Sequence, residues 1–313
     1  MTSSNTAREP AHGTAGGGLS AYSAPVDPVR VRLEISYDGT DFSGWAIQPD
    51  RRTVCGELTD ALSMILRSPV RLTVAGRTDA GVHASGQVAH VDLEREVWEQ
   101  HRSRLVRRLA GVLPADVRVR SAQLAPPDFD ARFSGLSRSY EYKISDQPWG
   151  LDPLQRRDAI AWPRTLDTAR MQAAADGLVG LHDFAAYCRR RPDASTIRTL
   201  LRFDWGRRAD GLVLGSVTAD AFCHSMVRSL VGALLAVGDG SKPIAFPREL
   251  LAASERSSLI TVAPARGLTL IGVEYPPDNQ LAARNVITRG RRDWSTDPTR
   301  PTLRRNPGFA IGG

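Results

Sequence analysis

Residues 75–84 bring together the groups that acid–base or nucleophilic chemistry uses, between two predicted strands. Asp79 offers a carboxylate, a group that is ionised at neutral pH and can act as a base or a nucleophile. Arg77 offers a guanidinium for a phosphate or a base, and Gly76 and Gly81 let the backbone approach a ligand closely. Asp79 could also cap a turn, as aspartates often do. The stretch is therefore a candidate catalytic loop, with a purely structural role for Asp79 left open.

The elements that would hold this loop follow from hydrophobic periodicity. Apolar and polar residues alternate over 31–37, which is typical of a half-buried strand. Apolar residues then recur at helical spacing over 54–66, behind the candidate N-cap Thr53. The first half continues with a strand at 70–74, a strand at 88–93, a helix at 98–109 and a strand at 117–124. Its order is β-α-β-β-α-β, and the candidate loop connects the second strand to the third.

The same order recurs in the second half. Alternation around Tyr140 and Tyr142 predicts a strand, and helices are predicted after Asp167 and over 222–237. The remaining elements are strands near 199–205, 212–218 and 268–275 and a short helix opened by Pro247. Two tandem ferredoxin-like halves are the economical interpretation. The predicted fold class is therefore α+β, with a mixed, largely antiparallel sheet.

Charge narrows the functional class. The 313 residues carry a formal net charge of +7, and Lys143 and Lys242 are the only lysines among 41 basic residues. A basic chain rich in guanidinium groups suits a polyanionic partner. A codon bias toward arginine would also explain the excess of arginine over lysine. Much of the charge lies after Asn279, where prolines and arginines predict little fixed structure. The predicted parts are a flexible leader (1–28), an N-terminal half (29–125), a C-terminal half (126–278) and an Arg-rich tail without fixed structure (279–313).

The cysteines and the apolar stretches indicate the compartment. Cys55, Cys188 and Cys223 show no CxxC spacing, so they predict neither a zinc ribbon nor a disulfide framework and favour a reducing cytoplasm. The longest apolar stretch, 230–237, is far shorter than the roughly 20 residues of a membrane span. We therefore expect no contact with a membrane.

The run GRTDAGVHA at residues 76–84, followed by Gly86-Gln87-Val88, resembles the catalytic motif of the tRNA pseudouridine synthase A family. The resemblance extends over about residues 30–276, in the order of the family. Its further motifs are Tyr37-Asp38-Gly39-Thr40, Gly44-Trp45, Phe129-Asp130-Ala131-Arg132-Phe133-Ser134, Arg138-Ser139-Tyr140-Glu141-Tyr142, Ala221-Phe222-Cys223-His224-Ser225-Met226-Val227-Arg228 and Gly267-Leu268. The chain departs from the family pattern at Ala46, Cys55 and Asp130, which affects expected RNA contacts more than catalysis.

The resemblance implies an enzyme that isomerises uridine to pseudouridine in the anticodon stem-loop of tRNA, at positions 38, 39 and 40. It implies two similar α+β halves that share a continuous sheet around a central RNA-binding cleft, the pseudouridine synthase fold. It also implies a cytoplasmic homodimer in which one subunit helps to position RNA for the other. No cofactor and no metal ion are required, because the isomerisation neither adds nor removes atoms and involves no redox change.

The resemblance also assigns roles to single residues. Asp79 resembles the catalytic aspartate, which acts as a covalent nucleophile or as the base that removes a sugar proton. Arg228 matches the arginine that pairs with this aspartate. Tyr140 matches the tyrosine that stacks on the flipped uracil, and Leu268 resembles the apolar residue under the ring. Arg77 resembles the residue that fills the space left by the flipped nucleotide. Without the resemblance, Tyr140 and Leu268 would by default be core residues.

Two other functional classes stay open. Duplicated β-α-β-β-α-β units also form RNA-recognition domains, so a non-catalytic RNA-binding module is an alternative, although the sequence lacks the aromatic strand motif of such domains. His83, His90 and Asp92 could converge as ligands of a metal hydrolase, but their spacing matches no ligand signature. The run Arg189-Arg190-Arg191-Pro192 could contact an RNA backbone or form a solvated loop.

Overall fold

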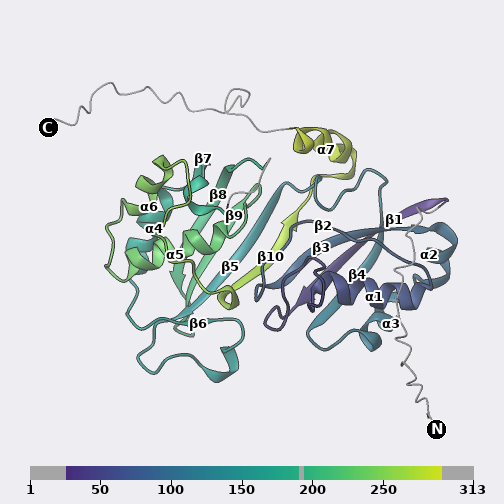
Figure 1. Cartoon of the computed structure of the whole chain (residues 1–313), viewed down its shortest axis with the longest axis horizontal. Helices are drawn as coiled ribbons and strands as arrows, with labels where there is room; N and C mark the ends of the chain where they lie inside the picture. Colours follow the sequence, from purple (N-terminus) through teal and green to yellow (C-terminus); the bar gives the residue numbers. More distant parts are fainter. Residues whose placement is uncertain (1–25, 190–193, 291–313) are drawn as a thin grey trace, which may run out of the picture.

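The structure is a computed structural model that describes residues 26–189 and 194–290. The leader predicted over 1–28 lies almost wholly outside the described residues, as do Arg190, Arg191 and Pro192 of the basic run. Figure 1 shows one long sheet with helices gathered at its two ends. No helix in the described ranges combines the length and the apolar character that crossing a membrane requires.

The first half of the sheet is built around β1 (Pro28–Tyr37). The predicted alternation is confirmed, since the inward-facing apolar residues of β1 are buried. The predicted N-cap is confirmed as well, because Thr53 accepts a hydrogen bond from Gly56 N at the start of α1 (Val54–Leu66). The other elements of this half are β2 (Thr73–Val74), β3 (His83–Glu94), α2 (Arg95–His101), α3 (Leu105–Val112) and β4 (Val117–Ala125).

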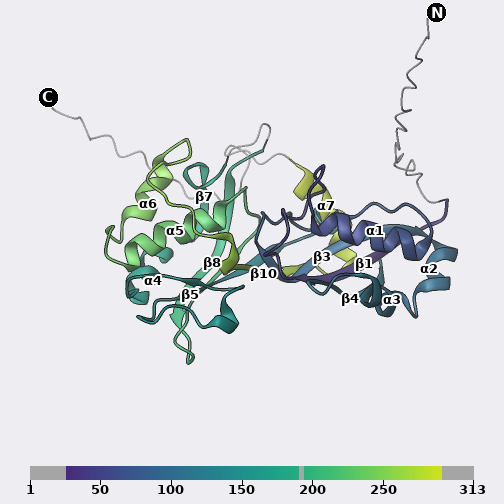
Figure 2. The ribbon, with the colours of Figure 1, turned by 60° about the horizontal axis from the view of Figure 1, so that its bottom comes forward.

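The second half repeats this arrangement. Its strands are β5 (Ser137–Ser145), β6 (Ile160–Ala161), β7 (Gly180–Asp183), β8 (Ile197–Arg207), β9 (Val213–Ala219) and β10 (Leu268–Glu274). Its helices are α4 (Thr168–Asp176), α5 (Met226–Gly238) and α6 (Phe246–Glu249), followed by α7 (Leu281–Arg289). Figure 1 and the turned view of Figure 2 both place α4, α5 and α6 at one end of the sheet and α1, α2 and α3 at the other.

All ten strands belong to one mixed sheet, in the order β4-β1-β3-β10-β5-β9-β8-β7, with β2 beside β3 and β6 beside β5. In each half the first long strand lies between the third and the fourth, and the second lies beyond the third, which is the ferredoxin-like order. Among the described strands, only β3–β10 and β5–β6 pair in parallel. The predicted α+β fold with two tandem halves and a largely antiparallel sheet is confirmed.

The two halves join where β10 lies against β3. One edge of β3 is covered by β1, and the other edge is shared between β2, at residues 89–90, and β10, at residues 83–84. Gly86 permits this close approach, because a Cβ atom there would lie 2.1 Å from the carbonyl oxygen of Ile271. The short β2 thus leaves an edge for β10, and the sheet continues from one half into the other.

Several predicted elements have different bounds, among them the strand predicted over 88–93, which begins earlier, at His83. The strand predicted over 70–74 is reduced to β2. The helix predicted over 98–109 is divided into α2 and α3, because the chain leaves the helical conformation at Arg104 (φ −123°, ψ −5°). The helix predicted from 222 begins at Met226, because Ser225 adopts the left-handed conformation (φ 63°). Residues 222–225 therefore form a loop in front of α5.

The tail prediction is wrong for its first part, because α7 is helical and Leu281 is buried. Asn285 donates through Nδ2 to the carbonyl oxygen of Asp128 (2.7 Å) and accepts from Ser134 Oγ (2.8 Å). A composition rich in arginine and proline does not reveal such distant partners, which fix the helix. The rest of the predicted tail, 291–313, lies outside the described residues.

The cysteine prediction is also corrected. Cys188 and Cys223 form a disulfide, with their Cα atoms 5.7 Å apart. The spacing of 35 residues gave no sign of this pair, because the bond depends on the turn Ala185–Tyr187 meeting the loop before α5 in space. Cys55 is a free, buried thiol in α1.

Candidate active site

Asp79 lies on the loop between β2 and β3, residues 75–82, at the point where the chain leaves the sheet. Ala75 N still donates to Val88 O at 2.9 Å, as in a regular ladder. At Gly76 the side chain of Gln87 replaces the backbone, since its Nε2 donates to Gly76 O at 2.9 Å. Gln87 is fully buried, so this side-chain bond fixes the exit of the loop from the sheet.

The register of β2 shows what displaced the loop. If the β2–β3 pairing continued along the chain, Asp79 would lie opposite Ala84, but Ala84 pairs with Leu270 of β10. The loop turns here: Val82 N donates to Asp79 O at 3.2 Å, and Gly81 adopts the left-handed conformation (φ 76°). Backbone groups close this turn, and the Asp79 carboxylate is directed to the second half of the molecule.

Buried polar groups support the loop from the first half. Thr78 Oγ1 and Tyr37 OH are 2.8 Å apart, and Gln87 Nε2 donates to the same hydroxyl at 3.2 Å. Trp45 N donates to Thr78 O at 3.1 Å. Burial raises the pKa of Tyr37 to about 12, although its hydrogen bonds oppose the shift. A neutral phenol therefore holds the residue before Asp79 throughout the physiological range.

Three side chains of the second half approach the carboxylate. His224 Nε2 lies 3.3 Å from Asp79 Oδ1. Ser225 Oγ donates to Oδ2 at 3.3 Å, and Arg228 Nη1 lies 3.7 Å from the same oxygen. The Asp79 side chain remains 25% exposed, so the carboxylate lies at an opening and not in the core. A fixed carboxylate with open access can serve as a base or as a nucleophile.

Arg228 is fixed by the backbone of the chain that leads into β10. Its Nε donates to Ala263 O at 2.8 Å, and its carbonyl oxygen accepts from Ala263 N at 3.0 Å. The same segment continues through the turn Ala265–Gly267 to Leu268 at the start of β10. The structure therefore brings Arg228 to Asp79, the pair that the family resemblance implies.

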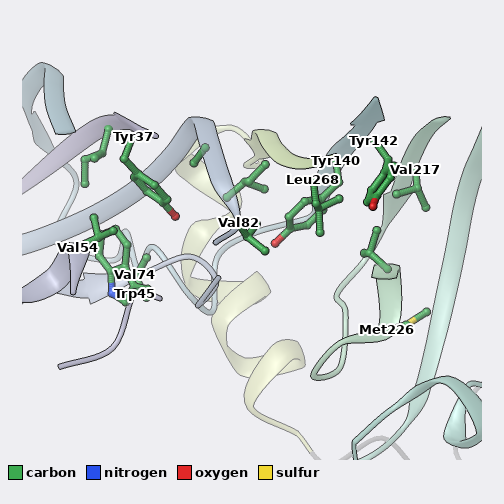
Figure 3. Close-up of a cluster of buried hydrophobic side chains, with 14 of the residues drawn as sticks. Tyr37, Trp45, Val54, Val74, Val82, Tyr140, Tyr142, Val217, Met226 and Leu268 are labelled. Carbon is green, nitrogen blue, oxygen red and sulfur yellow. The ribbon is translucent and has the colours of Figure 1, made fainter. Parts of the chain in front are cut away.

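Tyr140 and Leu268 belong to the buried cluster shown in Figure 3. The Tyr140 ring, on β5, is 8% exposed and packs edge-to-face on Phe222, with ring centroids 5.3 Å apart. Its hydroxyl end is directed toward Val82 of the loop (Figure 3). Burial, followed by the nearby Tyr37 and the negative charge of Asp79, raises the pKa of Tyr140 above its ordinary value. The structure thus places both residues next to the loop, with the tyrosine neutral.

The remaining predicted positions have simpler surroundings. Arg77 is exposed on the loop, whereas Cys55 is buried in α1. Asp130 closes a turn, since its Oδ1 accepts from Arg132 N at 2.8 Å and from Phe133 N at 2.9 Å. Ala46 is partly buried next to Trp45. None of these three departures is among the side chains given above as approaching the Asp79 carboxylate, which are His224, Ser225 and Arg228.

The residues of the metal alternative are occupied elsewhere. His83 Nδ1 lies 3.0 Å from Gly39 N and 3.2 Å from Asp38 Oδ1, and its Nε2 lies 3.0 Å from Arg266 O. His90 Nδ1 accepts from Ala131 N at 3.0 Å, and Asp92 is paired with Arg30. No group of three potential ligand residues comes together in residues 26–189 and 194–290. His83 instead links the two halves beside the loop.

Three residues at the site were not among the predicted ones: Gln87, His224 and Ser225. All three lie inside motifs that carry the resemblance, where roles were assigned only to Arg77, Asp79 and Arg228. The available signal for Gln87 was a polar residue within a strand whose neighbours are apolar. For His224 and Ser225 it was a polar pair near the start of a helix that is mostly apolar.

Comparison with known proteins adds independent evidence. A family model described as tRNA pseudouridine synthase matches residues 174–276. Proteins named tRNA pseudouridine synthase A from Frankia casuarinae, Streptomyces griseus and Mycobacterium leprae are 60%, 56% and 53% identical to this chain. The alignments cover 84%, 84% and 85% of this chain and 96%, 94% and 96% of those proteins. A chain in the solved structure titled "Crystal Structure of a Cbf5-Nop10-Gar1 Complex" aligns with 66% of this chain and 54% of its own length at 14% identity and a TM-score of 0.30, which is too loose to support an argument. The extent and identity of the curated relatives show that this chain belongs to the tRNA pseudouridine synthase A family.

Proposed function

We propose that this protein isomerises uridine to pseudouridine in tRNA, with Asp79 as the catalytic carboxylate. The observation that carries the proposal is the meeting of Asp79 from one half with Arg228 from the other, at the opening beside the β3–β10 junction. Further support comes from relatives named tRNA pseudouridine synthase A, which are 53–60% identical to this chain over most of their length. The net charge of +7 suits a polyanionic substrate.

The reaction asks for few groups. The glycosidic bond between C1′ and N1 breaks, the uracil turns, C5 bonds to C1′, and the proton on C5 leaves to solvent while N1 gains one. All bonds stay within one nucleotide, so the reaction consumes no second substrate and no redox cofactor. A carboxylate near the sugar supplies the required base or nucleophile, and that role falls to Asp79.

The other residues capture the base. A uridine in a stem must leave its stack, which costs a few kcal/mol. Tyr140 would stack on the extruded uracil, a contact worth about 1–3 kcal/mol, and Leu268 would pack under the ring. Arg77, exposed on the loop, would occupy the space left in the RNA. The Arg228 guanidinium would pair with the Asp79 carboxylate and help to hold it in place.

The finer assignments rest on the family alone. We propose uridines 38, 39 and 40 of the anticodon stem-loop as the targets, and a cleft between the halves 29–125 and 126–278 as the RNA site. We also propose a homodimer and a cytoplasmic location. The basic run Arg189-Arg190-Arg191-Pro192, of which Arg189 is exposed, would contact the RNA backbone.

The test is tritium release from unmodified tRNA that carries C5-tritiated uridine, without added cofactor. The wild type should release tritium, and Asp79→Asn should lower release by about three orders of magnitude or more, because an amide is neither a base nor a nucleophile. Asp60→Asn, on the exposed face of α1, is the matched control and should behave as wild type. tRNA binding without any tritium release by the wild type would favour the non-catalytic RNA-binding module.

A further inference from the structure

Ser225 adopts a conformation that its residue type disfavours. Its φ of 63° and ψ of 7° lie in the left-handed region, which residues other than glycine and asparagine seldom occupy. In the described ranges, Asp50 and Arg67 are the other non-glycine residues with positive φ, and both lie far along the chain from this loop. Unfavourable backbone conformations concentrate where the surroundings, often at a functional site, require them.

The Ser225 side chain does not do what a serine at this position usually does. A serine before a helix normally accepts a hydrogen bond from a backbone N–H of the first turn. Ser225 makes no such side-chain bond at the start of α5. Its Oγ donates instead to Asp79 Oδ2 at 3.3 Å. The hydroxyl is thus diverted from its own helix to the carboxylate of the other half.

His224 completes the arrangement on the second oxygen. Its Nε2 lies 3.3 Å from Asp79 Oδ1, while Ser225 contacts Oδ2. Rotation of the carboxylate about its Cβ–Cγ bond would break both contacts. Arg228 cannot supply this restraint alone, because its Nη1 is farther away, at 3.7 Å, and approaches only Oδ2.

The loop that carries the two residues is itself held in place. Arg189 N donates to His224 O at 3.0 Å, and Met226 N donates to Cys223 O at 3.0 Å. The disulfide between Cys188 and Cys223 ties the same loop to the turn Ala185–Tyr187. Donors on a fixed backbone restrict the carboxylate at little cost when the substrate binds.

We propose that Ser225 and His224 are positioning residues that fix the orientation of the Asp79 carboxylate toward the flipped nucleotide. They act through Asp79 and need not contact the RNA. The inference rests on the proposed function, since the orientation has value only if Asp79 attacks or deprotonates the substrate. In this proposal, the left-handed backbone at Ser225 directs the hydroxyl away from α5 and toward Asp79.

Ser225→Gly is the primary test, because glycine accepts the left-handed conformation and removes only the hydroxyl. We expect kcat for tritium release to fall about tenfold while KM for tRNA and Tm stay near wild type. His224→Ala should behave in the same way, and His224→Gln, which retains a donor, should recover part of the loss. The matched control is Ser229→Ala: this buried serine of α5 has a hydroxyl without a hydrogen-bond partner among the described residues.

Crystal structures of wild type, Ser225→Gly and Ser229→Ala give a readout that does not need turnover. The carboxylate should keep one orientation in wild type and in Ser229→Ala, and should rotate or split into two orientations in Ser225→Gly. An unchanged carboxylate, or a kcat equal to that of wild type, would overturn the inference, as would a parallel loss of Tm and tRNA affinity. A wild type without tritium release would instead contradict the proposed function, and the carboxylate orientations would still decide the positioning.

Discussion

The two halves of the sheet share one strand order but differ in their second strand. In the second half this strand is β8, which has 11 residues and pairs with β9 from Leu200↔Ala219 to Arg207↔Val213. In the first half it is β2, which has two residues. The chain that would have continued β2 became the loop with Asp79, and the uncovered edge of β3 accepted β10. The shortness of β2 therefore accounts for both the loop that carries Asp79 and the junction between β3 and β10.

The halves also differ in what they contribute chemically. The first half supplies the carboxylate and a buried support made by Tyr37 and Gln87. The second half supplies three side chains that approach the carboxylate, His224, Ser225 and Arg228. It also supplies the packed rings of Tyr140 and Phe222. Neither half holds a complete site, so substitutions in the two halves should fail in different ways.

Arg228→Met removes the cation that the second half offers to the first and should have the largest effect among the following variants. We expect turnover to fall about 100-fold, since the carboxylate loses its opposite charge and the Ala263 segment loses an anchor. Arg228→Lys keeps the charge without the Nε contact and should be intermediate. Single-turnover tritium release measures both. Arg248→Met, on the exposed side of α6, is the control, and turnover of Arg228→Met within twofold of wild type would contradict the pairing.

His90 tests the contact between β3 and the segment that follows β4. Burial, aided by the charge of Arg30, lowers the pKa of His90 to about 4 from its ordinary value of 6.5. The unfolded chain therefore takes up this proton first, and the contribution of the neutral imidazole to stability is complete above pH 6.5 and is lost as the pH falls toward 4. Between pH 6.5 and 4.5, the free energy of unfolding should fall by about 2 kcal/mol less in His90→Gln than in the wild type. The glutamine retains an acceptor for Ala131 N. Urea unfolding at both pH values gives the comparison, and equal losses in the two proteins would show that His90 does not titrate in this way.

Tyr140 separates stacking from core packing in the second half. Tyr140→Phe should keep turnover within about threefold, because the ring remains, whereas Tyr140→Ala should lower it about tenfold through loss of the stack. The measurement is tritium release at saturating tRNA, with Tm as the check on packing. Tyr142→Phe is the matched control, since the Tyr142 hydroxyl bonds to Pro264 O inside the core. Full activity of Tyr140→Ala would return Tyr140 to a purely structural role.

Deletion of α7 should have the smallest effect, because this helix lies outside both halves. Removing residues 279–313 eliminates the buried Leu281 and the Asn285 contacts and should lower Tm by about 4 °C. Removing only 291–313 retains every described contact and serves as the control. Thermal unfolding compares the two truncations, and an equal Tm would mean that α7 contributes nothing to the fold.

Local features of the fold were predictable from the sequence, because local physics determines them. The alternation in β1, the cap at Thr53 and the duplicated order of elements all depend on neighbouring residues. The bounds of β2 and α5 were not predictable, because they depend on tertiary competition for the edge of β3 and on the conformation of Ser225. Hydrophobic periodicity is a local signal, so it does not show that β10, nearly two hundred residues later in the chain, pairs with the edge of β3.

The site was predictable only through resemblance. Composition left Asp79 as either a turn residue or a catalytic group, and the motif selected the second interpretation. The contacts of His224 and Ser225 with the carboxylate depend on a loop held by Arg189 and Cys188, whose pairing no spacing indicates. The helix α7 was missed for a related reason, since its partners lie near Asp128 and not beside it in sequence.

The position of β10 has a consequence for how the protein is made on the ribosome. β3 ends at Glu94, whereas β10, its partner strand from the second half, begins at Leu268. The first half is therefore complete long before β10 is synthesised. At translation rates of roughly 5–20 residues per second, the nascent chain would expose the edge of β3 for on the order of ten seconds or more. Unpaired edges invite association between chains. Slow synthesis between residues 94 and 268 should therefore increase aggregation of newborn chains, and enzyme activity should be the last property to emerge.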